Sequence, residues 1–375
     1  MSDEISKLSD ELLEHILSFL PTKQAIAASL VCKRWKTLWR SLSTLHLDDS
    51  IYQNYISFVK FVYGVFICGD FRSIKKFHLV CQSCDSYPNQ IKIWAAHAAL
   101  NLKVEQLELI FPFSNYSLLS GVFVCSTIKE LKLEGLLVDS LSCVNLPSLK
   151  IMHLQRAKFH DFKLVAMLLS GCPLLESLSL SFKCRGMPAN VAAAVDVADL
   201  KHLASATFGP FMMNLKAFSN VKFLSLCETF WIPSQDHMPT YDNLTRLEFS
   251  CYAKDWGEIV KCLKNCPKLQ NLVIRKALAG SPNNHHEEVE SLMEPVFEVP
   301  QCISSHLKTF YLAEYEDFNS QFQMVRFIWR EAKVLRTITL SSSVGKKKRK
   351  MMRRQMLERL SRCCMGRVNC NLLFD

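Results

Sequence analysis

The 375-residue sequence has little glycine, modest charge and no long uninterrupted apolar run. It contains 11 glycines, and no GxxxxGK[ST], GxSxG or HExxH segment occurs, so it offers no phosphate loop, nucleophile elbow or zinc-protease helix. The longest apolar stretch, Phe58 to Cys68, is interrupted by Lys60 and is too short to cross a bilayer. We therefore predict no catalytic residue, no cofactor and no membrane association.

The sequence also lacks the signals of export and of metal binding. MSDEISKL has no basic start followed by an apolar run, which predicts a soluble intracellular protein of the nucleus and/or cytoplasm. Its 16 cysteines are then expected to be reduced and mostly buried. Cys81 and Cys84 form a CxxC with no second pair at zinc spacing, and His285 and His286 lie in a polar loop, so no metal site is predicted.

The net charge of +10 is concentrated near one end of the chain. Ten lysines and arginines between Lys346 and Arg367, against Glu358, give +9, so the remaining residues carry about +1. This distribution argues against nucleic acid as the main partner. The segment Lys346 to Arg354 is either a nuclear-localisation signal or the solvated face of a terminal helix, and the interleaved methionines and leucines favour the helix.

What the sequence does contain is a compact helical segment from Ile5 to Trp39. Ser9 can cap a helix whose first turn holds Asp10 and Glu11. One broad apolar face is predicted for Leu12, Leu13, Ile16, Leu17 and Leu20, before Pro21 ends the helix. Thr22 can cap a second helix, and a third would place Val31, Trp35, Leu38 and Trp39 on one face. A module of roughly 45 residues seldom gains more than ~3–5 kcal/mol from its own core, so it needs a neighbour.

LSDELLEHILSFLP followed by SLVCKRWKTLW resembles the F-box, in particular its plant form with an RWxxLW ending. The resemblance implies binding to a Skp-type adaptor, and through it to cullin and RING subunits of a ubiquitin ligase. The residues it would divide between the module's core and the adaptor interface are Leu8, Leu12, Leu13, Ile16, Leu20, Pro21, Val31, Cys32 and Trp35. The family usually has proline where this chain has Ser9, which would weaken the first adaptor contact.

A triplet of the pattern LxxLxL recurs along the rest of the chain at intervals of about twenty to forty residues. Its last two apolar positions, one residue apart, are typical of a short strand with one buried face. These pairs are Leu45/Leu47, Phe77/Leu79, Leu107/Leu109, Leu131/Leu133, Met152/Leu154, Leu178/Leu180, Leu224/Leu226, Leu247/Phe249, Leu272/Ile274, Phe310/Leu312 and Ile338/Leu340, with a degenerate copy from Leu203 to Phe208.

Such units bury their apolar sides only by stacking into a parallel ladder, with helices or irregular segments returning behind it. Two segments fit returning helices, one with Val165, Leu168 and Leu169 facing inward and one with Ile259, Cys262 and Leu263. Each ends in Cys-Pro, at Cys172 and at Cys266, where a small thiol fits a tight corner.

The triplets resemble the irregular leucine-rich repeats of plant F-box proteins. The residue between each apolar pair should point away from the core and line an open concave face that binds a substrate. These candidate substrate-binding residues are Glu108, Lys132, His153, Ser179, Ser225, Glu248, Val273 and Tyr311. Their mixed chemistry leaves the substrate, a protein of unknown identity, undetermined.

From Glu298 onward the chain resembles the FBD domain that follows F-box and leucine-rich repeats in plants. The matching residues are Val299, Pro300, Cys302, Leu307, Lys308, Val325, Ile328, Trp329, Leu335, Cys370 and Phe374. A strand, a helix between Gln321 and Lys333, a second strand and a terminal helix would cap the open end of the repeat array.

We therefore predict an α/β protein with a three-helix F-box (residues 1–49), an open leucine-rich-repeat solenoid (50–297) and an FBD end cap (298–375). The predicted function is that of a non-catalytic substrate receptor in an SCF-type ubiquitin ligase. The alternative is a leucine-rich interaction scaffold that has lost adaptor binding and is nuclear through its basic tail.

Overall fold

The computed structural model describes residues 8–28, 35–69, 74–82, 88–111, 116–117, 120–184, 200–208, 215–227, 239–250, 256–275, 298–316, 319–342, 345–363 and 370–375. The chain forms two compact units, Met1–Asn190 and Val191–Asp375. Within the described ranges, no helix is long and apolar enough to cross a membrane.

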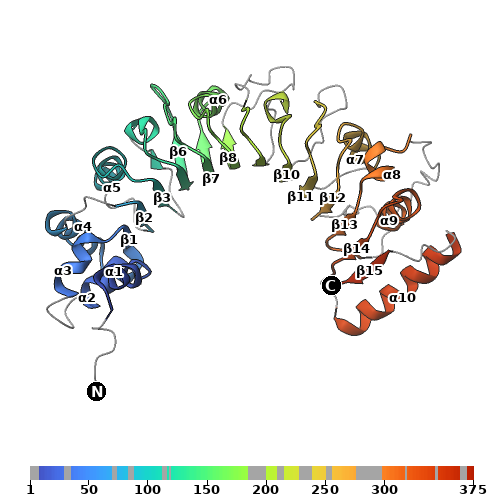
Figure 1. Ribbon diagram of the computed structural model, residues 1–375, viewed down its shortest axis with the longest axis horizontal. Coiled ribbons are helices and arrows are strands. Elements are labelled where there is room, and N and C mark those ends of the chain that lie inside the picture. The colour runs from blue at the N-terminus through green and yellow to red at the C-terminus, as the bar shows by residue number, and fades with distance from the viewer. Residues whose placement is uncertain are drawn as a thin grey trace. The chain divides into compact units, whose positions relative to one another are not determined.

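The first unit begins with small helices and continues as a parallel sheet. Its helices are α1 (Asp10–Ser18), α2 (Thr22–Ala28), α3 (Trp35–Leu38), α4 (Tyr55–Cys68), α5 (Pro88–Ala96) and α6 (Phe162–Ser170). Its strands are β1 (Thr44–Asp48), β2 (Lys76–Val80), β3 (Gln106–Ile110), β4 (Tyr116–Ser117), β5 (Glu130–Glu134), β6 (Leu136–Val138), β7 (Ile151–Phe159) and β8 (Ser177–Cys184). The strands β1, β2, β3, β5, β7 and β8 pair in that order, all parallel, while α4, α5 and α6 lie on one side of them (Figure 1).

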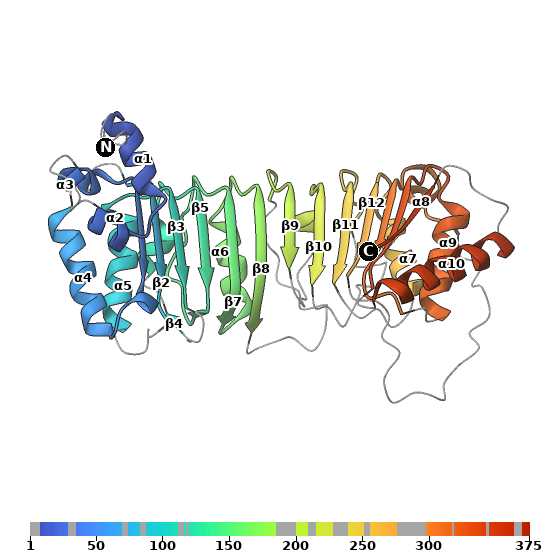
Figure 2. The same cartoon turned by 90° about the horizontal axis from the view of Figure 1, so that it is seen from below.

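The second unit repeats this arrangement. Its helices are α7 (Trp256–Lys264), α8 (Gln301–Ser305), α9 (Asn319–Glu331) and α10 (Lys346–Cys363). Its strands are β9 (Ser205–Phe208), β10 (Phe223–Cys227), β11 (Arg246–Ser250), β12 (Asn271–Ile274), β13 (Thr309–Leu312), β14 (Thr337–Leu340) and β15 (Asn371–Phe374). Each strand pairs in parallel with the next, from β9 to β15, so this sheet is also open (Figure 2).

The strand register explains why the LxxLxL triplets recur. Leu45, Phe77 and Leu107 are direct partners on β1, β2 and β3, and the next row begins with Leu47 and Leu79. These side chains are at most 1% exposed, because each strand turns its two apolar residues to the same face as its neighbour does. The predicted pairs, including the degenerate copy in β9, all lie in these strands, which confirms the parallel ladder.

The two predicted returning helices are α6 and α7. Val165, Leu168 and Leu169 are buried in α6, as are Ile259, Cys262 and Leu263 in α7. The thiols of the following Cys172 and Cys266 are buried and donate to helix carbonyl oxygens at 3.2 and 3.5 Å. Burial raises the pKa of Cys172 to about 12, so this thiol is a packing group and not a nucleophile.

The C-terminal region continues the sheet. Strands β13 and β14, which the triplets predict, and β15 pair in parallel beyond β12, so the sheet crosses the predicted boundary at residue 297. Strand β15 was missed because NLLF follows the basic segment without a complete triplet. The predicted helix between Gln321 and Lys333 is α9, whose Val325, Ile328 and Trp329 are buried.

Glycine is needed where β5 turns into β6. Gly135, between β5 and β6, has a φ of 73°, and a Cβ at this position would lie 1.8 Å from the carbonyl oxygen of Phe111. The backbone amide of Phe111 donates to the carbonyl of Glu134 at 2.9 Å, which holds the two segments together. A side chain at this position would clash with the neighbouring backbone as well as adopt a disfavoured φ.

Candidate functional site

Helix α1 has one face inside a small helical core. Leu13 and Leu17 are fully buried and pack with Ala25 of α2 and with Leu38 and Trp39. Leu8, Leu20, Ile26 and Trp35 are partly buried against the same cluster. The described residues of the helical segment therefore form a small core of their own.

The apolar face of α1 continues beyond the buried residues. Leu12 is 52% exposed, Ile16 42% and Phe19 74%, and the ring of His15 lies 4.8 Å from that of Phe19. At 100° per residue, the five residues of the predicted broad face lie within about 140° of arc. The core buries only the side of this face that carries Leu13 and Leu17, so Leu12 and Ile16 form an adjoining exposed stripe.

The remaining predicted adaptor-binding residues divide as follows. Leu8, Leu20 and Trp35 belong to the rim of the core, and Pro21 is half-buried between α1 and α2. Val31 and Cys32 lie outside the described residues. Phe19, the most exposed apolar side chain of this segment, was absent from the prediction, although it continues the Leu12 and Ile16 stripe by a further turn.

Ser9 begins α1 as the sequence predicts. Its side chain accepts a hydrogen bond from the Leu12 amide at 3.4 Å, and its φ is −66°. Proline also requires a φ near −65°, so the helix start is compatible with the proline that the resemblance leads one to expect.

Helix α2 is fastened directly to the first strand of the sheet. Thr22 is fully buried, and its hydroxyl oxygen accepts a hydrogen bond from the backbone amide of His46 at 2.8 Å. The ammonium of Lys23 donates to the carbonyl of Ile51 at 3.2 Å and lies 4.2 Å from the ring of Tyr52. Thr22 was predicted to cap α2, but its hydroxyl instead joins the helices to β1.

We call the sheet face opposite α4–α6, or opposite α7 and α9, the inner face of each unit. In the first unit, register partners across the strands form one inner row, and the predicted Glu108, Lys132, His153 and Ser179 all belong to it. The row begins with His46 and His78. The sequence signal for these two was present, since they occupy the middle position of the triplets in β1 and β2.

Charges in this row are paired within the sheet. His78 Nδ1 lies 2.8 Å from Glu108 Oε2, and the Lys76 ammonium lies 3.5 Å from the same oxygen. The hydrogen bond from His78 lowers the pKa of Glu108 to about 2. Lys132 pairs with Glu130 at 2.8 Å, and this hydrogen bond raises the pKa of Lys132. The row thus presents polar groups of both signs.

Two histidines of the row have lowered pKa values. Burial lowers the pKa of His46, and the neighbouring His78, whose ring centroid lies 4.3 Å away, lowers it further. Burial also lowers the pKa of His153, with a contribution from the Lys132 cation. Both imidazoles are therefore held in the neutral form near pH 7, where they can donate and accept hydrogen bonds.

The inner row of the second unit has a different chemistry. Ser225, Glu248, Val273 and Tyr311 are successive register partners, as predicted. However, Ser225, Glu248 and Val273 are 4%, 6% and 8% exposed, so they form the floor of the face and do not stand out from it. Tyr311 is half-buried and remains accessible.

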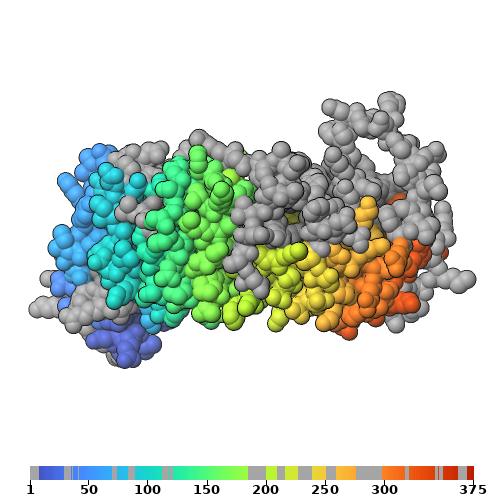
Figure 3. Space-filling view, turned by 90° about the horizontal axis from the view of Figure 1, so that it is seen from above, coloured from blue at the N-terminus to red at the C-terminus, as the bar shows by residue number. Residues whose placement is uncertain are grey.

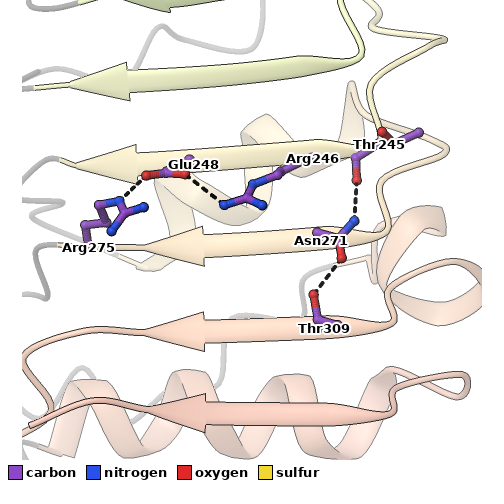
Figure 4. Close-up of polar contacts among 6 residues, drawn as sticks. All are labelled: Thr245, Arg246, Glu248, Asn271, Arg275 and Thr309. Atoms are coloured by element: carbon purple, nitrogen blue, oxygen red, sulfur yellow. Dashed lines mark hydrogen bonds and ion pairs between the residues drawn. The ribbon is translucent and has the colours of Figure 1, made fainter. Parts of the chain in front are cut away.

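Glu248 is held between two arginines (Figure 4). Arg275 Nε donates to its Oε1, and Arg246 Nη2 lies 3.4 Å from its Oε2. The two arginine side chains are 53% and 48% exposed, whereas that of Glu248 is 8% exposed. On the neighbouring strands, Asn271 donates to the Thr245 carbonyl and accepts from the Thr309 hydroxyl at 2.7 Å. These bonds fix the polar groups that a bound partner would meet.

A further hollow of about 330 Å³ lies at the carboxyl ends of β6, β7 and β8. Its lining residues are Leu137, Asp139, Lys158, Phe159, His160, Lys183 and Cys184. Lys158 and Lys183 are register partners on adjacent strands. The triplet pattern gave no sign of this hollow, since it forms where β7 and β8 extend beyond the apolar pairs.

The basic segment forms helix α10. Met352, Met356 and Leu360 are buried along one side, and the Arg359 guanidinium lies 3.6 Å from the ring of Phe322 on α9. Arg353 and Arg354 are exposed, and Arg354 pairs with Glu358 at 3.2 Å. This is the solvated helix that the interleaved methionines and leucines favour, while the localisation signal stays a prediction.

Among the residues that the structure describes, no three His, Cys, Asp or Glu side chains are grouped closely enough to hold a metal ion. Cys81 is buried, while Cys84, His285 and His286 lie outside the described residues. The exposed apolar stripe of α1 and the polar inner rows are therefore the candidate sites among the described residues.

Comparison with known proteins identifies the parts of the chain. Residues 5–47 match the F-box domain, residues 148–173 a leucine-rich repeat and residues 295–340 the FBD domain. The architecture is that of an F-box/FBD/LRR-repeat protein. The F-box match ends within β1, and the repeat match spans all of β7 and helix α6.

Relatives with this architecture extend over the whole chain. F-box/FBD/LRR-repeat protein At4g26340 of Arabidopsis thaliana is 28% identical over 439 residues, covering 100% of both chains. FBD-associated F-box protein At3g52670 of the same plant is 26% identical over 414 residues, covering 100% of this chain and 97% of its own. F-box/FBD/LRR-repeat protein At5g56420 is 26% identical, with coverage of 100% and 99%. The domain boundaries at residues 49 and 297 stay predictions, since the F-box match ends at residue 47 and the FBD match begins at residue 295.

Proposed function

We propose that this F-box/FBD/LRR-repeat protein is the substrate-recognition subunit of an SCF-type ubiquitin ligase. Its F-box binds a Skp-type adaptor, which joins it to cullin and RING subunits, and the inner faces of its repeats bind a protein substrate. The chain supplies no catalytic group of its own and acts by holding the substrate near the enzyme that its partners carry.

The observation that carries this proposal is the exposed apolar stripe of α1. Leu13 and Leu17 belong to the core formed by the described residues 8–28 and 35–42, whereas Leu12, Ile16 and Phe19 are 52%, 42% and 74% exposed and stand outside that core. A clustered apolar patch on a short exposed helix is a typical contact for a partner protein. The position of this stripe in the F-box match supports a Skp-type adaptor as that partner.

The inner rows support the substrate-binding part of the proposal. Parallel strands fix their side chains at regular intervals, and the groups exposed there are hydrogen-bonded or ion-paired to one another. A surface held in one geometry loses little conformational entropy when it binds. The half-exposed arginines beside Glu248 and the polar row of the first unit are its candidate contacts.

The test is co-purification of the full chain with a Skp-type adaptor. We expect Leu12→Arg and Ile16→Arg to abolish the complex while the chain keeps its circular dichroism and thermal midpoint, because both side chains are exposed. Leu174→Arg, at a position 43% exposed outside the F-box, is the matched control. Unchanged adaptor binding by the α1 variants would refute the proposal, and failure of the parent chain to bind would favour the scaffold function instead.

The proposed complex acts in the nucleus and/or cytoplasm. The exposed arginines of α10 are candidates for an import signal, which microscopy of a fluorescent fusion would test. Replacement of Arg353 and Arg354 by glutamine should reduce nuclear signal, whereas an unchanged distribution would remove α10 from this role.

A further inference from the structure

Helix α4 has two apolar faces, of which one is buried and the other is largely exposed. Its sequence, YISFVKFVYGVFIC, has Lys60 as its one charged residue. Phe58, Val62 and Val65 are buried against the sheet, yet Ile56 is 49% exposed, Tyr63 39% and Ile67 80%. A helix that is apolar on all sides is normally surrounded by protein.

The outward residues of α4 are spaced as in a helix-pairing seam. Ile56, Lys60, Tyr63 and Ile67 follow one another at intervals of four, three and four residues, and all are exposed. At 100° per residue they form one stripe opposite Phe58, Val62 and Val65. The helix is firmly started, since the Asn54 side chain accepts a hydrogen bond from the Ser57 amide at 2.9 Å.

The neighbouring surface extends the stripe. Helix α5 packs beside α4 through Trp94, whose ring lies 5.9 Å from that of Tyr63, and Ile93 of α5 is 53% exposed. Both helices lie on the outer side of the first unit, where α4 forms the blue margin of the space-filling view (Figure 3). The half-exposed side chains leave roughly 400 Å² of apolar surface, the size at which a patch marks an interaction site.

We propose that this stripe binds the same stripe of a second copy, with the two α4 helices antiparallel. The two-fold axis would pass between residues 61 and 62, so residue i of one copy faces residue 123−i of the other. Ile56 then meets Ile67 of the second copy, and Lys60 meets its Tyr63. The two-fold axis repeats each of these two pairs once, so the seam has four layers and each layer contains a side chain from both copies.

The charge of Lys60 favours the antiparallel pair over a parallel pair. A parallel pair would bring Lys60 against Lys60, since a parallel seam matches equal positions. In the antiparallel pair each ammonium lies over a tyrosine ring, which is an attractive contact. A single lysine in an otherwise apolar seam is a known means of fixing register and strand number. The stripe is thus complementary to itself in one orientation.

The size of the stripe sets the strength of the contact. About 400 Å² on each copy, or about 800 Å² in total, is below the roughly 1,000 Å² that a stable interface buries, so the dimer should be weak and depend on concentration. Loss of one aliphatic layer, with a charge placed in it, should weaken association by roughly tenfold or more.

The first measurement is sedimentation velocity of the full chain, with its adaptor if the complex forms, over a wide concentration range. We expect a reversible monomer–dimer equilibrium that Ile56→Glu and Ile67→Glu each shift toward monomer. Met167→Glu, on the exposed side of helix α6 at 40% exposure, is the matched control and should leave the equilibrium unchanged. A chain that stays monomeric, or a dimer that resists both α4 variants, overturns the proposal.

The second measurement tests the orientation. In a background with Cys68→Ser and Cys143→Ser, which removes two exposed thiols, we mix an Ile56→Cys chain with an Ile67→Cys chain under mild oxidation. The mixture should form a disulfide-linked dimer far faster than either chain alone. Faster cross-linking of each chain to itself would indicate a parallel pair and overturn the register. If the adaptor protects the introduced thiol of the Ile67→Cys chain from alkylation while that chain remains monomeric, the adaptor is the occupant and the proposal is wrong.

Discussion

Glu248 and its two arginines should respond very differently to loss of one partner or the other. The carboxylate is 8% exposed, whereas Arg246 and Arg275 are about half exposed. If Glu248 is replaced by glutamine, both guanidinium groups can turn to water. If the arginines are replaced by methionine, the carboxylate stays on the floor of the inner face without its cations.

The expected magnitudes follow from this asymmetry. Removing the cation from a buried pair costs about 3–5 kcal/mol, and we take about 3 kcal/mol because shorter side chains admit some water. Glu248→Gln exchanges charge-assisted hydrogen bonds for neutral ones while relieving the carboxylate's desolvation, a net loss of about 1 kcal/mol. The difference of about 2 kcal/mol is roughly thirtyfold in an equilibrium constant.

Hydrogen exchange of the backbone amides of β11 and β12 measures this effect locally. We expect Arg246→Met with Arg275→Met to speed exchange there roughly thirtyfold more than Glu248→Gln does, under conditions where exchange reports the opening equilibrium. Adding Glu248→Gln to the double variant should restore most of the protection. If the arginine variant costs no more than the glutamine variant, the carboxylate is not buried in the way the structure places it.

Two further predictions concern the first unit. The pKa values of His46 and His153 lie below the ordinary 6.5, so the unfolded chain binds more protons than the folded chain as the pH falls. Their contribution to stability is therefore fully present above about pH 6.5 and is lost below it. The thermal midpoint should therefore fall between about pH 7.5 and about pH 5.5, and His46→Gln with His153→Gln should flatten the decline; a midpoint that rises on acidification would contradict the assignment. Thr22→Val should destabilise the first unit by about 1–3 kcal/mol in denaturant unfolding, because the His46 amide loses its buried acceptor. Thr22→Ser should retain most of the stability, and equal losses in the two variants would show that the hydroxyl contributes nothing.

The repeating strands were predictable because their signal is periodic. Two apolar residues one position apart, such as Leu131 and Leu133, define a strand face, and stacking copies turn them the same way. The inner rows follow from the same rule. The triplet pattern predicted the row positions of Glu248 and Val273 correctly. It also predicted that both side chains are exposed, whereas they are buried, because the exposure of a strand residue depends on side chains from other strands. Arg275 lies 27 residues from Glu248, and no local pattern joins them.

The burial of the α1 residues also could not be predicted from their spacing alone. The spacing of Leu12, Leu13, Ile16 and Leu17 indicates an amphipathic helix, but it does not determine which side of a broad apolar face is buried. Which pair is buried depends on Ala25, Leu38 and Trp39, which come from later helices. Strand β15 lacks the first apolar position of the triplet, so only its parallel pairing with β14 reveals it.

The attachment of α2 to β1 has a mechanical consequence. Thr22 and Lys23 join the start of α2 to His46, Ile51 and Tyr52, so α2 is held against the first strand of the sheet and the turn that follows it. In the proposed ligase, these contacts would oppose turning of α2 against β1. The direction in which a substrate bound near β1 is presented would then depend on Thr22 and Lys23 as well as on the substrate's own shape.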